Sequence, residues 1–214
     1  MKKLALPLTI ISLATSAAFV STSASAEGAV SANVGVVSEY IFRGITQTTT
    51  STASAGVDYE NGGFYAGIWT ADVVDGLEID YYAGYGLETE SGVGISAGFT
   101  RYDYTGNFDT RYDEFNFGLS YDMFSLSYNV GEWEDGAGAG MDSDYSFLSL
   151  TVEKDGFYGT YGTFGKDSDG SYVEVGYGTE IGGFDAGVAL IKSDEDLAAD
   201  NGDSSLVLSL SKSF

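Results

Sequence analysis

The sequence of 214 residues carries nine Lys or Arg residues against 32 Asp or Glu residues, which gives a formal net charge of −23. This acidity excludes a nucleic-acid partner, because no basic surface is available to displace counterions from phosphates. The chain contains no histidine and no cysteine, which excludes Ser-His hydrolase sites, zinc and haem sites and disulfides, so no cofactor is expected. Its 16 Tyr, 13 Phe, 2 Trp and 30 Gly are typical of a closed sheet rather than of a disordered acidic chain.

The first 26 residues have the pattern of a secretory signal peptide. Lys2 and Lys3 precede an almost uncharged apolar run at residues 4–20, and Ala24 and Ala26 form a small-x-small cleavage site. An N-terminal membrane anchor is the alternative, but the run is short for a membrane span. We therefore expect cleavage after Ala26 and an exported chain of residues 27–214.

The exported chain alternates apolar and polar residues with period two. Only a β-strand places such alternating residues on two opposite faces. In residues 124–130, Phe124, Leu126 and Tyr128 lie on one face, opposite Ser125 and Ser127. Twelve such segments follow one another, at residues 30–43, 51–60, 63–71, 77–88, 92–103, 110–121, 124–133, 144–154, 157–166, 170–179, 183–192 and 204–214.

The connections between these segments alternate in length. Those after every second segment are short, whereas others are long, such as residues 134–143 and 193–203. Short turns on one rim and longer loops on the other are typical of outer-membrane barrels. The sequence therefore predicts an all-β fold: a transmembrane, antiparallel, up-and-down β-barrel of about 12 strands, in which the last strand closes on the first. A soluble β-sandwich is the alternative, because it also buries alternating faces.

Aromatic residues of the outward phase gather at the ends of the strands next to the short turns. This predicted membrane girdle consists of Tyr59, Phe64, Tyr121, Phe124, Phe157, Tyr177 and Phe184. The chain ends in Phe214, preceded in phase by Leu206, Leu208 and Leu210, as in the terminal assembly signal of such barrels; Lys212 departs from that pattern. The expected location is the outer membrane of a Gram-negative bacterium, and the expected partners are its lipids and the barrel assembly machinery.

Charged residues of the opposite phase are predicted to line the pore, since charges facing lipid are costly. They are Glu39, Arg43, Asp58, Glu78, Asp80, Glu114, Glu174 and Asp185. Because seven of the eight are acidic, we expect a passive channel for small hydrophilic solutes or ions that prefers cations. Inward glycines such as Gly67, Gly84, Gly98 and Gly176 leave room for a pore. The alternative is a plugged barrel, in which Arg43 pairs with acids and inward rings fill the lumen.

Other chemistries remain as alternatives. Asp167 and Asp169, and Asp194 with Asp196, Asp200 and Asp203, offer hard oxygen ligands for calcium, but neither cluster completes a calcium loop, and no metal site is predicted. A carboxylate-pair glycosidase is conceivable among 32 acids, although turns and solvated faces explain them, and no enzyme activity is expected. A non-conducting structural or adhesive barrel, whose acidic loops bind divalent cations or a partner, is the second functional hypothesis. The oligomeric state stays open.

Two segments resemble a known family. Residues 38–47, SEYIFRGITQ, and residues 63–69, GFYAGIW, are similar to the early blocks of the TorF family of porins, and the resemblance extends to Ser213 and Phe214. The resemblance implies an outer-membrane porin and names no transported solute. It therefore supports the fold more than the function.

Overall fold

The computed structural model describes residues 28–134, 142–198 and 203–214. Ala24, Ala26 and the remainder of the predicted signal peptide, like Asp200, lie outside these residues, so signal cleavage stays a prediction. The described strands are β1 (Ala29–Val37), β2 (Tyr40–Phe42), β3 (Ile45–Thr48), β4 (Thr52–Asn61), β5 (Phe64–Val73), β6 (Gly76–Glu88), β7 (Val93–Tyr104), β8 (Tyr112–Tyr121), β9 (Phe124–Trp133), β10 (Ser143–Lys154), β11 (Phe157–Lys166), β12 (Ser171–Ile181), β13 (Phe184–Ser193) and β14 (Ser204–Ser213).

Twelve of these strands close into one antiparallel barrel, and β2 and β3 form a separate two-stranded sheet. Each barrel strand pairs with its neighbours in the chain, β1 with β4 across the β2–β3 hairpin, and the seam joins β14 to β1. At the seam, Val36 lies opposite Leu210, and the backbone amide of Phe214 donates to the carbonyl of Ala32 at 2.9 Å. The predictions of a closed barrel of about 12 strands and of a seam between its ends are confirmed.

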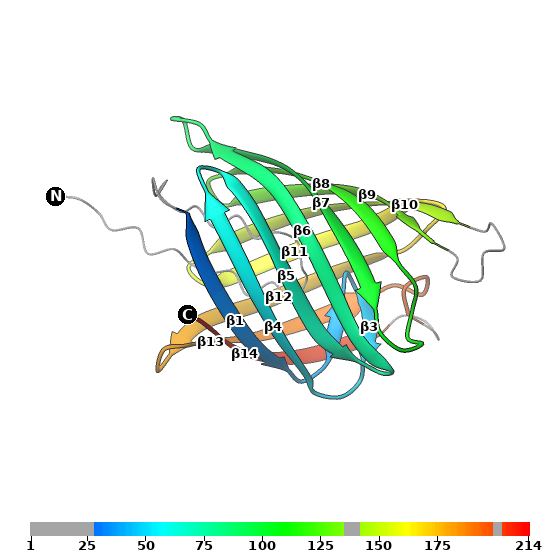
Figure 1. Ribbon diagram of the computed structural model, residues 1–214. Helices are drawn as coiled ribbons and strands as arrows, with labels where there is room; N and C mark the ends of the chain where they lie inside the picture. Colours follow the sequence, from blue (N-terminus) through cyan, green and yellow to red (C-terminus); the bar gives the residue numbers. More distant parts are fainter. Residues whose placement is uncertain (1–27, 135–141, 199–202) are drawn as a thin grey trace.

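The two rims of the barrel differ. The turns after β4, β6, β8, β10 and β12 lie at one end, towards the left of Figure 1, and we call this end the turn-side rim. The connections after β1, β5, β7, β9, β11 and β13 lie at the other end, and we call it the loop-side rim. β6 and β7 pair antiparallel across the turn that joins them, as the up-and-down topology predicts.

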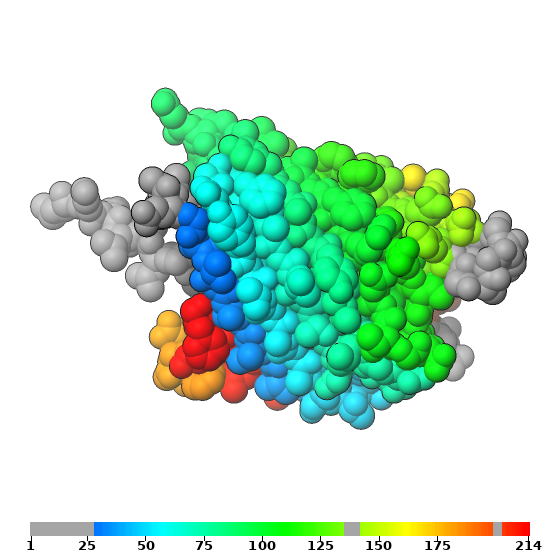
Figure 2. Space-filling view, viewed as in Figure 1, coloured from blue at the N-terminus to red at the C-terminus, as the bar shows by residue number. Residues whose placement is uncertain are grey.

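The wall separates an apolar exterior from a largely polar interior. Along β9, the outward Phe124, Leu126 and Tyr128 are 48%, 39% and 43% exposed, whereas inward Asn129 is 3% exposed. On the face seen in the space-filling view, the side chains of neighbouring strands form a closed outer surface (Figure 2). Within residues 28–134, 142–198 and 203–214, no helix has the length and hydropathy needed to cross a membrane.

The first predicted strand, residues 30–43, is wrong at its end, whereas the ends of the other eleven differ from the structure by at most two residues. β1 stops at Val37, Ser38 and Glu39 form a bend, and the chain turns into the separate hairpin β2–β3. Tyr40 has the sequence phase of the outward Val34 and Val36, but it is only 2% exposed. Its position continues the alternation of β1, so periodicity alone could not reveal that the chain leaves the wall.

Candidate functional site

The hairpin β2–β3 lies inside the barrel. Its contacts reach strands around the wall: Tyr40 contacts Trp69 of β5 and Glu78 of β6, Phe42 contacts Tyr102 of β7, Arg43 contacts Glu114 of β8 and Phe147 of β10, and Gly44 contacts Ser193 of β13. A nine-residue segment can contact so many strands only from within the lumen. Figure 1 agrees, with the light-blue hairpin inside the ribbon of the barrel near the loop-side rim.

Arg43 at the tip of the hairpin forms a buried, bidentate ion pair with Glu114. Its two terminal nitrogens donate to the carboxylate at 2.6 and 2.8 Å, and the two side chains are 3% and 0% exposed. The Glu114 carboxylate also accepts from Tyr145 at 2.9 Å and from Asn116 at 2.6 Å. The guanidinium lies 4.5 Å from the ring centroid of Phe147. Such a satisfied pair fixes the hairpin to the wall, because either charge alone would be buried without its partner.

The tip of the hairpin requires unusual backbone angles. Arg43 and Gly44 have φ values of 50° and 81°, the left-handed region that a tight two-residue turn uses. The Ser193 hydroxyl donates to the carbonyl of Gly44 at 2.6 Å. A Cβ at Gly44 would come within 2.7 Å of the Cβ of Tyr172. The turn therefore needs glycine both for its φ and for its close approach to β12.

Apolar side chains pack on both sides of the hairpin. On one side, Ile41 joins a buried cluster with Phe147, Tyr172 and Ile191. On the other side, Tyr40 packs with Ala71 and Val73, and its hydroxyl donates to Glu78 at 2.7 Å. The hairpin and these clusters occupy the loop-side part of the lumen. This arrangement corresponds to the plugged alternative at that end of the barrel.

The predicted inward charges fall into three groups. Glu78, Asp80 and Glu114 lie on the wall beside the hairpin and are at most 2% exposed. Asp58 lies nearer the turn-side end of β4, and Glu174 lies near the loop-side start of β12. Both are half-buried, and each carboxylate accepts a tyrosine hydroxyl, from Tyr82 and Tyr158 respectively.

The third group consists of Glu39 and Arg43, which do not lie in wall strands as predicted, and of Asp185 near the end of a wall strand. Glu39 is in the bend between β1 and β2, and Arg43 is at the hairpin tip; neither lies in a wall strand, because the chain leaves the wall after Val37. Asp185 is the second residue of β13, in the inward phase and opposite Glu180. Six of the eight residues are therefore inward residues of wall strands.

The positive charges are arranged differently from the acids. Among the described Lys and Arg residues, Arg43 alone lies deep in the lumen. Arg101 pairs with outward Asp113 at 2.7 Å, Arg111 pairs with Asp103 at 2.9 Å, and Lys166 lies near Asp144 at the loop-side rim. Lys212 lies over Phe184 and Phe214 at the other rim, and Lys154 and Lys192 are exposed outward residues. The interior is thus acidic, and its one deep cation is neutralised.

Four of the inward glycines do not leave open space, contrary to the interpretation made from the sequence: Gly67, Gly84, Gly98 and Gly176. A Cβ at Gly67 would come within 2.4 Å of the Tyr82 hydroxyl oxygen, and a Cβ at Gly176 within 2.4 Å of the Tyr158 ring. Tyr65 covers Gly84 and Gly98 in the same way. These glycines therefore provide the space in which inward tyrosine rings pack along the wall; we call these positions tyrosine seats.

The predicted girdle residues all lie outward near the turn-side rim. They are between 38% and 66% exposed: Tyr59, Phe64, Tyr121, Phe124, Phe157, Tyr177 and Phe184. The terminal Leu206, Leu208 and Leu210 are likewise exposed outward residues of β14, and Phe214 is 72% exposed. The structure gives their positions; their roles in membrane anchoring and assembly stay predictions.

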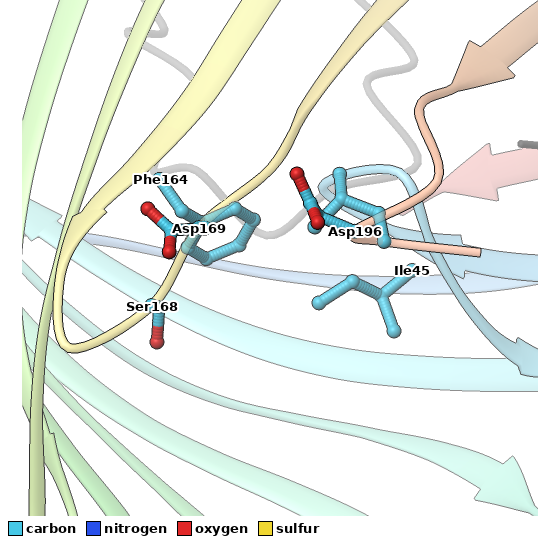
Figure 3. A pocket seen from close by; sticks show the side chains of 6 residues that line it. Ile45, Phe164, Ser168, Asp169 and Asp196 are labelled. Carbon is cyan, nitrogen blue, oxygen red and sulfur yellow. The ribbon is translucent and has the colours of Figure 1, made fainter. Parts of the chain in front are cut away.

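A pocket of about 350 Å³ lies at the loop-side rim beside the hairpin. Figure 3 shows Phe164, Ser168 and Asp169 on one side of it and Ile45 and Asp196 on the other; Leu197 completes the lining. Among the described residues, no group of three or more acidic side chains is placed to hold a metal ion.

The turn that carries Asp196 and Leu197 is organised by Asp194. Its carboxylate accepts from the amide and the hydroxyl of Ser171 at 2.6 and 2.8 Å, and from the amides of Asp196 and Leu197. Desolvation works to raise the pKa of Asp194, but these hydrogen bonds outweigh it and hold the pKa below its ordinary value. Asp194, which belongs to one of the two acidic clusters considered for calcium, thus joins the loop to the start of β12.

Several residues of the lumen were not identified from the sequence. Tyr102, Tyr145 and Asn116 bind Glu114, and Phe147 packs against Arg43. Their inward phase near the loop-side ends of β7, β8 and β10 was visible, and large inward aromatics there were the available signal. Their common partner was not visible, because it belongs to a hairpin that the sequence pattern assigned to the wall.

Comparisons with known proteins agree with the barrel. A protein from the work "Unveiling the Mechanism Behind the in-meso Crystallization of Membrane Proteins" is similar over 86% of this chain and 83% of that chain, with a TM-score of 0.60 and 10% identity, which shows a shared fold. OccK3 (OpdO) of Pseudomonas aeruginosa has a TM-score of 0.38 and 15% identity, over 79% of this chain and 58% of that chain. OpdK of Pseudomonas aeruginosa, solved with vanillate, has a TM-score of 0.40 and 12% identity, over 78% and 57%.

The chain spans less than two thirds of these two Pseudomonas proteins, and likenesses at such scores carry no argument about function. No curated protein matches the sequence. One family model, described as "Bacterial protein of unknown function (Gcw_chp)", matches residues 21–214. Its description does not use the name TorF, which stays a resemblance. Because the match covers nearly the whole chain, the protein belongs to the bacterial family Gcw_chp.

Proposed function

We propose that this protein is a porin-like passive channel of the bacterial outer membrane, for small hydrophilic solutes or ions, and that it prefers cations. A closed barrel satisfies its backbone hydrogen bonds without water, which is the requirement for crossing a bilayer with strands. Its exterior exposes large apolar side chains such as Val30, Phe115 and Leu208 at 71%, 60% and 56%. Such an exterior suits acyl chains, and the aromatic rings at the turn-side rim suit the membrane interface.

The separation of charge across the wall carries the functional proposal. Asp58, Glu78, Asp80, Glu114 and Glu174 face the interior, and Arg43 is the only described cation deep within it. Fixed charges of one sign in a lumen with low-dielectric walls enrich the opposite ion. Because Arg43 is neutralised by Glu114, the remaining field favours cations.

A second candidate is a non-conducting barrel with a structural or binding role. The observation that favours it is the hairpin, which together with the clusters around Ile41 and Tyr40 occupies the loop-side part of the lumen. In the channel proposal, the hairpin limits the passage to small species. In the second candidate, it closes the passage.

The remaining parts of the proposal concern the route to the membrane. Residues 1–26 act as a cleaved signal peptide, and the assembly machinery reads the terminal strand that ends in Phe214. No catalytic role is proposed for the inward carboxylates. A turnover assay on polysaccharide substrates that gave activity dependent on those carboxylates would favour the barrel-enzyme alternative instead.

Planar-bilayer recording of the refolded protein tests the proposal. We expect discrete conductance steps and, across a salt gradient, a reversal potential of the sign that cations give. Protein that inserts stably without conductance would favour the second candidate. An anion-selective reversal potential would overturn the assignment of cation preference.

A further inference from the structure

The pocket at the loop-side rim combines an apolar floor with two carboxylates. Ile45 comes from the hairpin, Phe164 from the end of β11 and Leu197 from the turn after β13, while Asp169 and Asp196 lie on opposite sides (Figure 3). The pocket joins three separate segments of the chain. Its volume of about 350 Å³ lies at the lower end of the range of small-molecule sites.

The floor of the pocket is held in place by close packing. A Cβ at Gly170, where φ is 111°, would come within 2.6 Å of the Leu197 side chain, and a Cβ at Gly44 within 3.0 Å of it. Leu197 is therefore packed against both the hairpin tip and the β11–β12 loop. The hairpin wall is fixed in turn by the ion pair of Arg43 with Glu114. The pocket is thus preformed, which lowers the ordering cost of binding.

No Lys or Arg of the described part of the chain forms an ion pair with either carboxylate. Across the described ranges, the ion pairs found involve other acids, and Asp169 and Asp196 take part in none. A guest with a positive charge would complement both oxygens, and an apolar group on that guest would cover Ile45, Phe164 and Leu197. A bare metal ion would bind the two carboxylates but would leave Ile45, Phe164 and Leu197 exposed to water.

We propose that this pocket binds a small organic ammonium ion with an apolar arm. The ammonium group lies between Asp169 and Asp196, and the arm packs on the floor formed by Ile45, Phe164 and Leu197. The inference deepens the proposed function and rests on it in one respect, namely that such a cation is a solute of the channel. Binding itself depends only on the pocket.

The test uses the full exported chain in lipid nanodiscs and 2-phenylethylammonium as the probe, followed by calorimetry and saturation-transfer NMR. We expect saturable binding with NMR contacts from the ring. Ethylammonium, which lacks the ring, is expected to bind at least about tenfold more weakly, because burial of a phenyl group is worth more than that factor. Phenylacetate, of similar size but anionic, is expected not to compete.

Asp169 and Asp196 are both exposed. Asp169→Asn and Asp196→Asn are each expected to raise the Kd about two- to fivefold, as the loss of an exposed ion pair does, and the double variant more. Asp72→Asn is the matched control, since Asp72 is an exposed acid at the loop-side end of β5, outside the pocket. It removes the same charge from the same rim and is expected to leave the Kd unchanged. An equal effect of the control, or equal binding of phenylacetate, would overturn the proposal.

Calcium competition and conductance separate the remaining outcomes. Displacement of the probe by calcium at equal concentrations, without any difference between the two ammonium ions, would overturn the proposal in favour of a divalent-cation site. Binding that follows the expected pattern in a barrel without conductance would support the pocket and refute the channel. Conductance without binding of the probe would support the channel and refute the ammonium pocket.

Discussion

Arg43 and Glu114 lie 71 residues apart in the sequence and meet inside the barrel, where two hydrogen bonds of 2.6 and 2.8 Å join them. This pair attaches the tip of the hairpin to β8, on the side of the lumen opposite its origin in β1. The hairpin is therefore a bridge across the lumen with a fixed far end, and not a loose loop over the mouth.

Arg43→Ala is expected to destabilise the folded barrel by about 3 to 5 kcal/mol, the cost of leaving one member of a buried pair without its partner. We also expect larger conductance steps, because the hairpin loses its far attachment. The measurements are urea unfolding in micelles and bilayer recording. Arg101→Ala is the control, since it removes an exposed ion pair from the exterior; an equal loss of stability there would show that the burial of Arg43 is not the cause.

The half-buried lumen acids are expected to set the ion preference. Glu78 and Asp80 are nearly inaccessible beside the hairpin, whereas Asp58 and Glu174 are half-buried. The double variant Asp58→Asn with Glu174→Gln should move the reversal potential towards zero. The reference is the limit of about 59 mV that an ideally selective pore gives for a tenfold salt gradient. The preference should also fade from 0.1 M to 1 M salt, as the Debye length falls from about 10 to about 3 Å.

Glu132→Gln is the control for that measurement, because Glu132 is an exposed outward residue of β9. It changes the net charge without changing the lumen. A shift as large as that of the double variant would show that surface charge, and not the lumen, determines the selectivity.

Gly176 and Gly178 provide a paired test of the tyrosine seats, since both are inward residues of β12. A Cβ at Gly176 would collide with Tyr158, but at Gly178 it would meet no atom within 4 Å. Gly176→Ala is therefore expected to lower the unfolding free energy by about 1 to 3 kcal/mol. Gly178→Ala is expected to be neutral or to stabilise by up to about 1 kcal/mol. Equal effects in urea unfolding would contradict this account.

Phe214→Ser is expected to impair assembly while leaving the lumen unchanged. The ring at the end of β14 is exposed on the exterior, and the backbone of Phe214 pairs with Ala32 at the seam. We expect less heat-modifiable protein in the outer membrane and more periplasmic degradation. Phe157→Ser removes a girdle ring away from the seam and serves as the control; equal losses for the two variants would indicate a general loss of interface anchoring.

Period-two alternation was sufficient to predict the wall, because the barrel strands from β4 to β14 expose apolar side chains on the outer face and turn mostly polar or small side chains to the lumen. The hairpin escaped prediction for a physical reason. Tyr40 and Phe42 keep the outward phase of Val34 and Val36, and an aromatic residue satisfies either lipid or an apolar core. The Arg43–Gly44 pair was the available signal for a turn.

The inward position of six of the eight charges follows from their phase, but their hydrogen-bond partners do not. Glu114 was assigned to the lumen from its phase alone, and the structure agrees. Its four partners come from the hairpin, β7, β8 and β10. Such a set depends on the curvature of the wall and on where the hairpin enters, and neither is encoded in local alternation.

The place of the hairpin in the chain constrains the order in which the barrel forms. The hairpin follows β1 directly, and its attachments to β5, β6, β7, β8 and β10 involve segments that precede β14. A sheet growing from β4 onward can therefore curl around the hairpin as an internal template, before the seam exists. Pairing of β14 with β1 joins the two ends of the sequence, which makes it the contact with the greatest loop-closure cost. We expect the template to bring those edges together, so that the last strand completes a cylinder whose curvature is already set.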